Sequence, residues 1–313
     1  MKAFLFPGQG SQQIGMGREV YDAFACAREV FQEVNEALKQ NLTKIIFEGP
    51  LEDLTQTENT QPALMTVSMA VMRVLEKEGN YSLPAHVAYV AGHSLGEYSA
   101  LCAAGALSLS EAARLLKIRG QLMQQAVPAG QGAMAAILGL EMVDIEKIVK
   151  AAAEGEVCQI ANDNSPGQVV ISGQKEAIER AIELSKEAGA KRSLLLNVSA
   201  PFHCALMQSA QDKMEKILSE ATIEDPLVPV MDNVSAESVQ EGNAFRDLLT
   251  RQMTGRVRWR ESLMHLESLG VNMAVEIGAG KVLTGLVKRT VPEMETLALG
   301  TPEDIENFLK TNS

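Results

Sequence analysis

The chain has 313 residues, of which 46% are hydrophobic and 22% are charged, and its formal net charge at pH 7 is -12. This length is long for one compact domain and short for three, and the composition is typical of a globular protein with a substantial core. The negative net charge argues against nucleic-acid binding as a main role.

The first residues and the cysteines bear on the compartment. The apolar run near the start of the chain is only a few residues long, which is too short for a signal peptide. No window approaches the ~20 apolar residues that a membrane span requires. None of the four cysteines belongs to a C-x-x-C pair, which argues against a zinc site or a redox motif. We therefore expect a cytoplasmic protein that acts without a membrane or a metal.

The first third of the chain predicts one strand and two helices. Residues 3–6 are expected to form a short buried strand, followed by a glycine-rich turn over residues 7–12. Apolar residues between Val20 and Leu38 recur at alternating spacings of four and three, which predicts one amphipathic helix. Gly49-Pro50 breaks the chain, and a second helix is predicted over residues 60–78.

The stretch Gly92-His93-Ser94-Leu95-Gly96 has the pattern G-x-S-x-G. An apolar run of strand length precedes it, and a small, alanine-rich helical stretch follows. Strand, tight turn and helix are the setting of a nucleophile elbow, whose glycines leave room for a strained turn that exposes the serine hydroxyl. The N–H of Leu95 would open the helix and be free to stabilise an oxyanion. We interpret Ser94 as a nucleophile; the alternative is an ordinary serine in a strand-to-helix turn.

The middle of the chain changes pattern after Pro128–Gly132. Before this boundary, a helix capped by Ser110 runs to Leu122, with Arg119 among apolar neighbours. After it, the predicted order is strand, helix, two strands joined by a turn over residues 162–167, helix and strand. This β-α-β-β-α-β order is that of a ferredoxin-like unit. The predicted elements cover residues 133–138, 144–153, 157–161, 169–172, 175–188 and 193–198.

Strand and helix alternation resumes afterwards, with a helix over residues 206–217 and strands over residues 228–231 and 273–277. We therefore predict an α/β fold with a hydrolase-like core and a largely parallel sheet. Residues 1–128 and 199–313 would form this large domain, which carries the nucleophile elbow. Residues 129–198 would form the inserted ferredoxin-like β-α-β-β-α-β subdomain.

A serine nucleophile needs a base, and the chain has four histidines. His93 adjoins Ser94 on a sharp turn, where neighbouring side chains point apart. His86 precedes the elbow strand at its far end, and His265 lies within a helical pattern. His203 lies where the chain returns from the inserted unit, and a turn there can face a cleft, so elimination favours it over a satisfied loop histidine. No Asp or Glu stands out as its partner, and a backbone carbonyl could fix its tautomer instead.

Six segments together resemble the malonyl-CoA:acyl carrier protein transacylases, the family of enzymes that load malonyl units for fatty acid synthesis. The resemblance covers nearly the whole chain and is far more specific than G-x-S-x-G alone. The matching segments are Phe6–Gln12, Gln61–Ala63, Gly92–Glu97, Asn164–Gln168, His203–Met207 and Gly280–Gly285.

The resemblance implies a role for each catalytic position. Ser94 would be the acylated nucleophile and His203 its base. The backbone N–H groups of Gln9 and Leu95 would form the oxyanion hole. The main-chain carbonyl of Gln252 would hold the histidine, and it supplies the acceptor that the composition alone did not.

Arg119 matches the arginine that binds the malonyl carboxylate in this family. A guanidinium can bind a carboxylate through two parallel hydrogen bonds, and without an anionic substrate a buried guanidinium would be unpaired and costly. The alternative is a structural ion pair with a nearby Asp or Glu. Asn162 and His93 are further candidate substrate contacts. Phe202 resembles the bulky residue of malonyl-selective acyltransferases, which leaves little space for a branched acyl group.

Two features depart from the family pattern. Ala279 stands where the family usually has proline, which should alter loop stiffness more than chemistry. Arg256, Arg258 and Arg260 would share one face if their segment is extended. They could contact coenzyme A phosphates or an acidic carrier protein, or they could form a solvated surface, and both alternatives stay open.

The resemblance implies a ping-pong acyl transfer in which malonyl-CoA acylates Ser94 and acyl carrier protein then takes up the malonyl group. The implied partners are malonyl-CoA and acyl carrier protein, with no nucleic acid, metal or cofactor, and we expect a monomer. One alternative is a free-standing acyltransferase of a polyketide synthase. A second is a serine thioesterase or hydrolase, against which Arg119 and the missing acidic triad member argue. A third is an inactive subunit that binds the carrier protein.

Overall fold

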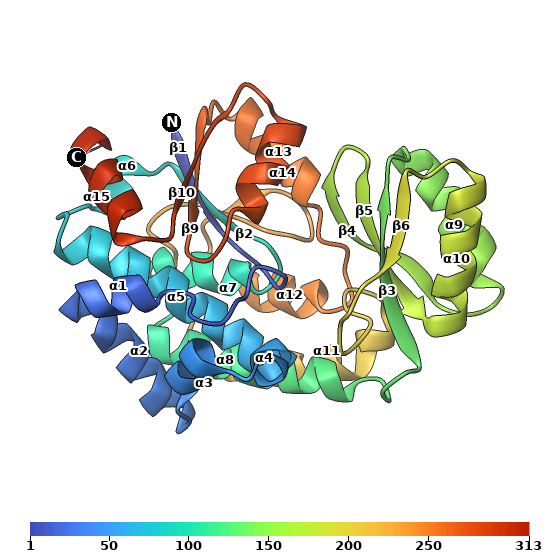
Figure 1. Ribbon diagram of the computed structural model, residues 1–313, viewed down its shortest axis with the longest axis horizontal. Helices are drawn as coiled ribbons and strands as arrows, with labels where there is room; N and C mark the ends of the chain where they lie inside the picture. The colour runs from blue at the N-terminus through green and yellow to red at the C-terminus, as the bar shows by residue number, and fades with distance from the viewer. Residues whose placement is uncertain (313) are drawn as a thin grey trace.

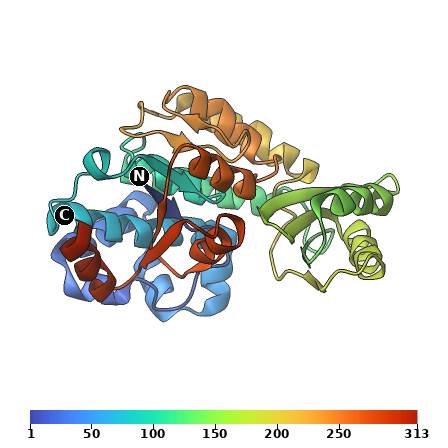
Figure 2. The same ribbon diagram turned by 90° about the horizontal axis from the view of Figure 1, so that it is seen from above.

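The computed structural model describes residues 1–312 and contains two β-sheets in separate parts of the molecule (Figures 1 and 2). Sheet A has six strands in the order β10-β9-β1-β2-β7-β8, and all neighbours are parallel except the last pair. Its strands are β1 (Lys2–Phe6), β2 (Tyr89–Gly92), β7 (Val230–Met231), β8 (Ser238–Val239), β9 (Met273–Ile277) and β10 (Glu295–Leu299).

Sheet B has four antiparallel strands in the order β4-β5-β3-β6. They are β3 (Gly132–Leu138), β4 (Cys158–Ser165), β5 (Gln168–Gln174) and β6 (Arg192–Leu195). Helices α9 (Met142–Ala153) and α10 (Lys175–Glu187) cover the outer face of this sheet (Figure 1). The predicted fold class, with its largely parallel sheet and its β-α-β-β-α-β unit, is confirmed. The domain boundaries at residues 128 and 198 stay a prediction.

Sheet A lies between two layers of helices, because both faces of its strands are apolar. In β1, Phe4 and Phe6 point to the layer that contains α2, α5 and α8, whereas Ala3 and Leu5 point to the layer that contains α13 and α14. This alternation follows from the two-residue period of a strand, and covering on both faces is usual for parallel sheets. The helices of this part are α1 (Arg18–Ala23), α2 (Ala25–Leu38), α3 (Leu42–Glu48), α4 (Leu51–Thr55), α5 (Thr57–Lys77), α6 (Leu83–His86), α7 (Gly96–Ala103), α8 (Leu109–Gln125), η1 (Ala205–Met207), α11 (Gln208–Glu220), α12 (Ala244–Gln252), α13 (Trp259–Ser268), α14 (Val282–Thr290) and α15 (Pro302–Asn312).

Three local predictions are wrong. The single helix expected from Val20 to Leu38 is two helices, because Phe24 is extended between them. The N-cap of α8 is Ser108 rather than Ser110, since the Ser108 hydroxyl accepts the N–H of Glu111 at 3.2 Å. Residues 162–165 continue strand β4 instead of forming a turn, and their pairing with β5 contains register shifts that an apolar-pattern argument does not anticipate.

The register of β1 against β2 fixes where the candidate nucleophile lies. Phe6, the last residue of β1, pairs with Gly92, the last residue of β2, so both strands end at the same edge. The N–H of His93 continues the ladder by donating to the Phe6 carbonyl at 3.0 Å. The glycine-rich turn after β1 therefore lies beside the G-x-S-x-G turn after β2. None of the described helices combines the length and the apolar character that crossing a lipid bilayer requires.

Gly96 is required by close backbone packing at this edge. A Cβ atom at Gly96 would lie 2.2 Å from the Phe6 carbonyl oxygen, which belongs to strand β1 and cannot move aside cheaply. We expect Gly96→Ala to lower the free energy of unfolding by about 3 kcal/mol. Urea unfolding followed by circular dichroism measures this change.

Gly285 provides the matched control, because it lies inside α14 and a Cβ there would meet no atom within 4 Å. Gly285→Ala should raise the free energy of unfolding by about 0.5–1 kcal/mol, since alanine loses less backbone entropy in a helix. Equal effects of the two substitutions would contradict the role of close packing at Gly96.

Candidate active site

Ser94 lies in the turn between β2 and α7 with a strained backbone. Its φ is 53°, in the left-handed region that non-glycine residues rarely adopt. The turn is held by Asn233, whose Oδ1 accepts the N–H of Ser94 at 2.7 Å and whose Nδ2 donates to the Gly92 carbonyl at 2.8 Å. Asn233 is 139 residues from Ser94 in the sequence, and its side-chain amide satisfies these two backbone groups of the turn. These two hydrogen bonds offset part of the strain, so the serine hydroxyl stays directed out of the turn.

His203 is the histidine that contacts Ser94. Its Nε2 lies 2.8 Å from the Ser94 Oγ, and its Nδ1 lies 2.9 Å from the backbone oxygen of Gln252. A carbonyl can only accept, so Nδ1 carries the proton and Nε2 presents a lone pair to the serine hydroxyl. The φ of His203 is 56°, a second strained position in the same site. The other ring candidates lie elsewhere: His86 stacks on Tyr81, and His265 Nδ1 is bonded to the Ala236 carbonyl.

The surroundings of His203 keep the imidazole neutral. Burial, followed by the positive charge of Arg119, lowers the pKa of His203 to about 3. A neutral ring at neutral pH can accept the proton of Ser94. The pair is therefore arranged as a nucleophile and a general base without a carboxylate.

Arg119 extends from α8 to the same point and is only 1% exposed. Its Nη1 donates to Gln61 Oε1 at 2.7 Å, and its Nη2 donates to Gln252 Oε1 at 2.7 Å and to Ser94 Oγ at 3.1 Å. Within residues 1–312, all its acceptors are thus neutral oxygens, and its Nε has no partner. Because a buried cation without an anion is costly, this arrangement points to an anionic ligand beside Ser94.

Helix α8 reaches this position through a close contact with α5. A Cβ atom at Gly120 would lie 2.5 Å from the Cα of Glu58, so the glycine lets the two helices approach. This close approach places Arg119 next to Gln61 of α5. Gln61 belongs to the matching segment Gln61–Ala63, but no role was expected for it.

Two backbone donors remain free at the mouth of the turn. Among the described residues, no acceptor is hydrogen-bonded to the backbone N–H of Gln9 or of Leu95. Gln9 follows β1, and its side chain is fixed by a 3.4 Å hydrogen bond to Thr57. Leu95 is the residue before α7, where backbone N–H groups have no partner within the helix. Both groups are available for a negatively charged oxygen that forms near Ser94.

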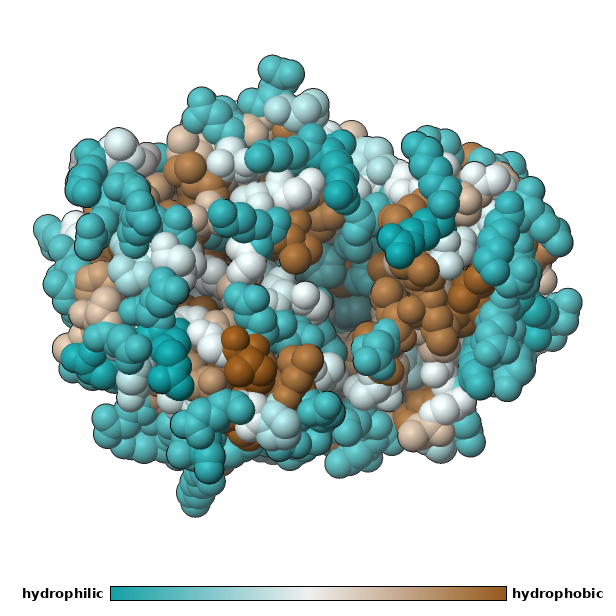
Figure 3. All heavy atoms as spheres, viewed as in Figure 1, coloured by the Kyte–Doolittle hydropathy of each residue, from teal (hydrophilic) through white to brown (hydrophobic). Residues whose placement is uncertain are grey.

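A cavity of about 340 Å³ connects these groups, and Figure 3 shows the hollow between the two parts of the molecule. The polar side includes Ser94 from the turn after β2, Arg119 from α8 and His203 from the chain just before η1. Sheet B and the chain after β6 supply an apolar side, formed by Met134, Val170, Leu196 and Val198. The cavity is also lined by Gln9, His93, Leu95, Asn162 and Phe202.

The other residues predicted to contact the substrate or to orient the histidine are His93, Asn162 and Gln252. His93 Nε2 is bonded to Asn164 Oδ1 at 2.8 Å, and burial lowers the pKa of His93. Asn162 lies in β4 and is 7% exposed. Gln252 lies behind Arg119 and His203 and is fully buried. Within residues 1–312, no group of three or more His, Cys, Asp or Glu side chains could hold a metal ion.

The three arginines before α13 do not form an extended basic face. Arg256 and Arg258 pair with Glu261, and Arg260 already belongs to α13 and binds Asp163 through Nε and Nη2. The backbone of the neighbouring residue 257 bridges to β4. The expected shared basic face is therefore wrong, because Glu261 neutralises Arg256 and Arg258 locally, and α13 begins at Trp259, so that Arg260 binds Asp163 of β4.

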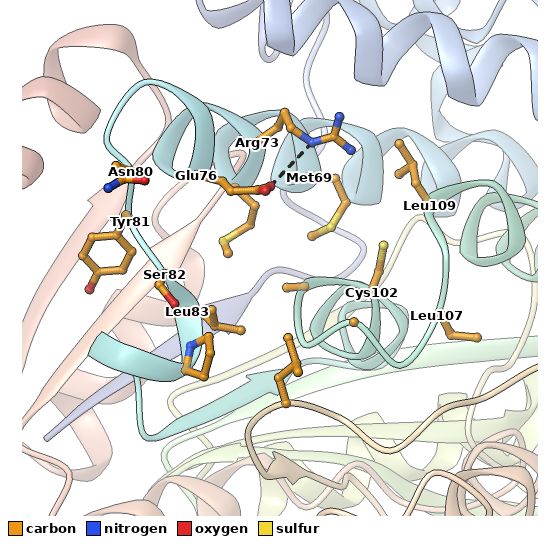
Figure 4. A pocket seen from close by; sticks show the side chains of 15 residues that line it. Met69, Arg73, Glu76, Asn80, Tyr81, Ser82, Leu83, Cys102, Leu107 and Leu109 are labelled. Carbon is orange, nitrogen blue, oxygen red and sulfur yellow. Dashed lines mark ion pairs between the residues drawn. The ribbon is translucent and has the colours of Figure 1, made fainter.

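A larger cavity of about 510 Å³ lies away from this site, between α5, the chain before β2 and α7 (Figure 4). Its charged residues Arg73 and Glu76 pair with each other across 3.9 Å. The thiol of Cys102 also faces it, and burial raises the pKa of this thiol to about 12, so the thiol stays protonated and unreactive. The cavity therefore offers volume without a nucleophile, and the smaller cavity at Ser94 is the candidate active site.

Two contributors escaped the sequence analysis. Asn233 follows the very short strand β7 and has no local signal of its own. Glu97 stands inside the quoted motif, and its side chain is 1% exposed at the start of α7. A charged residue in a small, apolar helix was the available signal, since buried carboxylates require partners.

Comparisons with known proteins agree with this geometry. A family model for the acyl transferase domain matches residues 3–308. The malonyl CoA-acyl carrier protein transacylases of Bacillus subtilis and Escherichia coli are 47% and 48% identical over 310 and 300 residues; the first alignment covers 99% of this chain and 96% of the relative, and the second covers 96% of both. An acyl-carrier-protein-S-malonyltransferase from Bartonella henselae superposes with a TM-score of 0.97 at 52% identity, covering 99% and 98% of the two chains. A malonyl-transacylase solved in complex with a type II polyketide synthase acyl-carrier protein superposes with a TM-score of 0.96 at 43% identity, covering 99% of both.

The low basicity of His203 predicts a pH profile. Inactivation by phenylmethylsulfonyl fluoride, an uncharged reagent for activated serines, should proceed at a constant rate from about pH 7 to about pH 5 after correction for the reagent's own hydrolysis. The rate should fall only as the pH approaches the pKa of about 3, because only then does the ring become protonated. A midpoint near 6.5, the ordinary histidine value, would contradict this electrostatic account.

Proposed function

The chain belongs to the malonyl CoA-acyl carrier protein transacylases of the acyl transferase family, and we propose how its residues transfer a malonyl group from malonyl-CoA to acyl carrier protein. The proposal depends mainly on one observation. The guanidinium of Arg119 lies 3.1 Å from the Ser94 hydroxyl, which is itself bonded to His203. A malonyl group carries its carboxylate and its thioester on the same methylene, so the anion-binding group must lie beside the nucleophile.

The first half-reaction makes a malonyl ester of Ser94. The malonyl carboxylate binds Arg119, and the Ser94 Oγ attacks the thioester carbonyl while its proton passes to His203 Nε2. The negative charge that develops on the carbonyl oxygen is stabilised by the N–H groups of Gln9 and Leu95. The carbon–sulfur bond then breaks, and the coenzyme A sulfur leaves with the proton from His203.

The second half-reaction repeats these steps with a different thiol. The phosphopantetheine thiol of acyl carrier protein gives its proton to His203 and attacks the ester carbonyl. The bond from this carbonyl to the Ser94 Oγ breaks, and the serine regains its proton from His203. The same oxyanion site serves both halves, and the steps use no metal or bound cofactor.

Arg119 is proposed to select the acyl group. In the free protein its donors face three neutral oxygens, so a carboxylate gains charge-assisted hydrogen bonds that an acetyl group does not. Gln61 and Gln252 hold the guanidinium plane in place before the substrate arrives, which reduces the entropy lost on binding. His93 and Asn162 both line the cavity and are proposed as further substrate contacts.

The proposal also covers the oligomeric state, the cellular location and the carrier protein. We propose a monomer, because one chain by itself brings together the nucleophile, the base and the guanidinium, and a cytoplasmic location, which fits four free cysteines. The carrier protein is proposed to be that of fatty acid synthesis. A polyketide carrier is the alternative with the same chemistry, and transfer assays with the two carriers distinguish them.

Acylation of Ser94 is the direct test. Intact-protein mass spectrometry after brief mixing with malonyl-CoA should show one malonyl adduct on the wild-type protein and none on Ser94→Ala. Turnover of malonyl-CoA by water, without an acceptor thiol, would favour the hydrolase alternative. Absence of any adduct on the wild-type protein would overturn the proposed function.

Replacement of Arg119 tests the choice of acyl group. Arg119→Met keeps an apolar stem of similar length but removes the charge, so malonylation should slow by roughly 10- to 100-fold because hydrogen bonds to a charged group are lost. Acetylation by acetyl-CoA should slow much less. The rate constants of both reactions, measured by rapid quenching and mass spectrometry, give the preference; an unchanged ratio would sink this role for Arg119.

A further inference from the structure

Glu97 is a buried carboxyl group that the reaction steps leave unused. It lies at the start of α7, three residues after Ser94, and is 1% exposed. Its Oε2 accepts the side-chain N–H of Gln252 at 2.8 Å and the backbone N–H of Asn233 at 3.1 Å. Its Oε1 has no partner among the described residues.

Gln252 joins Glu97 to all three functional groups. Its Nε2 donates to Glu97 and, at 3.1 Å, to the backbone oxygen of Ser94. Its Oε1 accepts from Arg119 at 2.7 Å, and its backbone oxygen accepts from His203 at 2.9 Å. The orientation of one side-chain amide therefore decides whether Arg119 meets an oxygen or an NH₂ group.

The acceptor character of Glu97 fixes that orientation. If the Gln252 amide rotated by half a turn, its NH₂ would face the donors of Arg119 and its oxygen would face Glu97 Oε2, leaving both contacts repulsive or unmade. The backbone oxygen of Ser94 favours the same orientation through a longer contact, 3.1 Å from Nε2 against 2.8 Å for Glu97 Oε2.

We propose that Glu97 is a positioning residue that sets the preference for malonyl over acetyl groups, because its Oε2 holds the Gln252 amide with Oε1 against Arg119. This inference rests on the proposed function. It assigns selectivity to a residue that does not line the cavity, whereas Arg119 itself makes the contact with the carboxylate.

Burial, followed by the negative charge of Asp232, raises the pKa of Glu97 to about 8. A neutral carboxyl group with its proton on Oε1 still accepts through Oε2, so the role of Glu97 requires an oxygen acceptor rather than a full charge. Glutamine at this position retains such an acceptor, whereas methionine of similar length does not.

The test measures second-order rate constants for malonylation and acetylation of Ser94 by rapid quenching and intact mass. We expect Glu97→Met to lower the ratio of the malonyl to the acetyl rate constant by about tenfold, through loss of a hydrogen bond that orients a charged group. Glu97→Gln should keep the ratio within about threefold of the wild type. A folding defect alone would lower both rate constants together and leave their ratio unchanged.

A double-mutant cycle tests whether Glu97 acts on Arg119 through the side chain of Gln252. Gln252→Met removes the side-chain amide but keeps the backbone carbonyl that binds His203, so it should also lower the ratio. The double variant Glu97→Met/Gln252→Met should show no lower ratio than Gln252→Met alone, because the two residues act through one contact. If the two substitutions lowered the ratio additively, Glu97 would not act through Gln252, and the inference would be overturned.

Ser99→Ala is the matched control, since Ser99 is buried in the same helix and its Oγ has no partner among the described residues. Its ratio should equal that of the wild type.

If Glu97→Met does not fold, Glu97→Asp replaces it, because the shorter side chain cannot reach Gln252 and should also lower the ratio. A folded variant with the wild-type ratio would overturn the inference, whereas failure of the wild-type protein to become acylated would overturn the proposed function instead.

Discussion

The buried guanidinium of Arg119 is the constraint on which the rest of the site depends. A charge that is 1% exposed must be surrounded by acceptors, and here α5, α12 and the turn at Ser94 each supply one. All three are neutral, so the free protein leaves the charge without its best partner. The architecture follows from this requirement, because α8 must pack closely against α5 and α12 must end where its last residue, Gln252, can reach both Arg119 and His203.

Strain at two residues is the second constraint. Ser94 and His203 both have positive φ, and each would be more stable in an ordinary turn. The register of β1 and β2, the clamp by Asn233 and the carbonyl of Gln252 hold them where the hydroxyl and the ring meet at 2.8 Å. The close packing of Gly96 under Phe6 belongs to the same set of contacts. The stability of sheet A is thus what maintains the geometry of the nucleophile.

The parts of this arrangement that local sequence could predict are those with local causes. The strand, turn and helix around Ser94 follow from residues within one stretch of chain, and His203 follows from elimination among four histidines. Arg119 and the backbone role of Gln252 came only from family resemblance. The side-chain contacts of Asn233, Glu97 and Gln252 join positions 133 to 158 residues apart, and no periodicity encodes such pairs. Residues 162–165 were expected in a turn for a related reason: pairing with β5, and not their own polar character, makes them a strand.

The shared position of Arg119 also links substrate choice to basicity. Its positive charge contributes to the low pKa of His203, and its Nη2 donates to the Ser94 hydroxyl that we propose as the nucleophile. A carboxylate bound to the guanidinium offsets that charge and competes for that donor. The imidazole then becomes a stronger base and the hydroxyl is released from one hydrogen bond, whereas a neutral acetyl group changes neither. Under the proposed function, the contact that binds a malonyl group would therefore also prepare the nucleophile, so that selection for a carboxylate would be expressed in the rate of the chemical step as well as in binding.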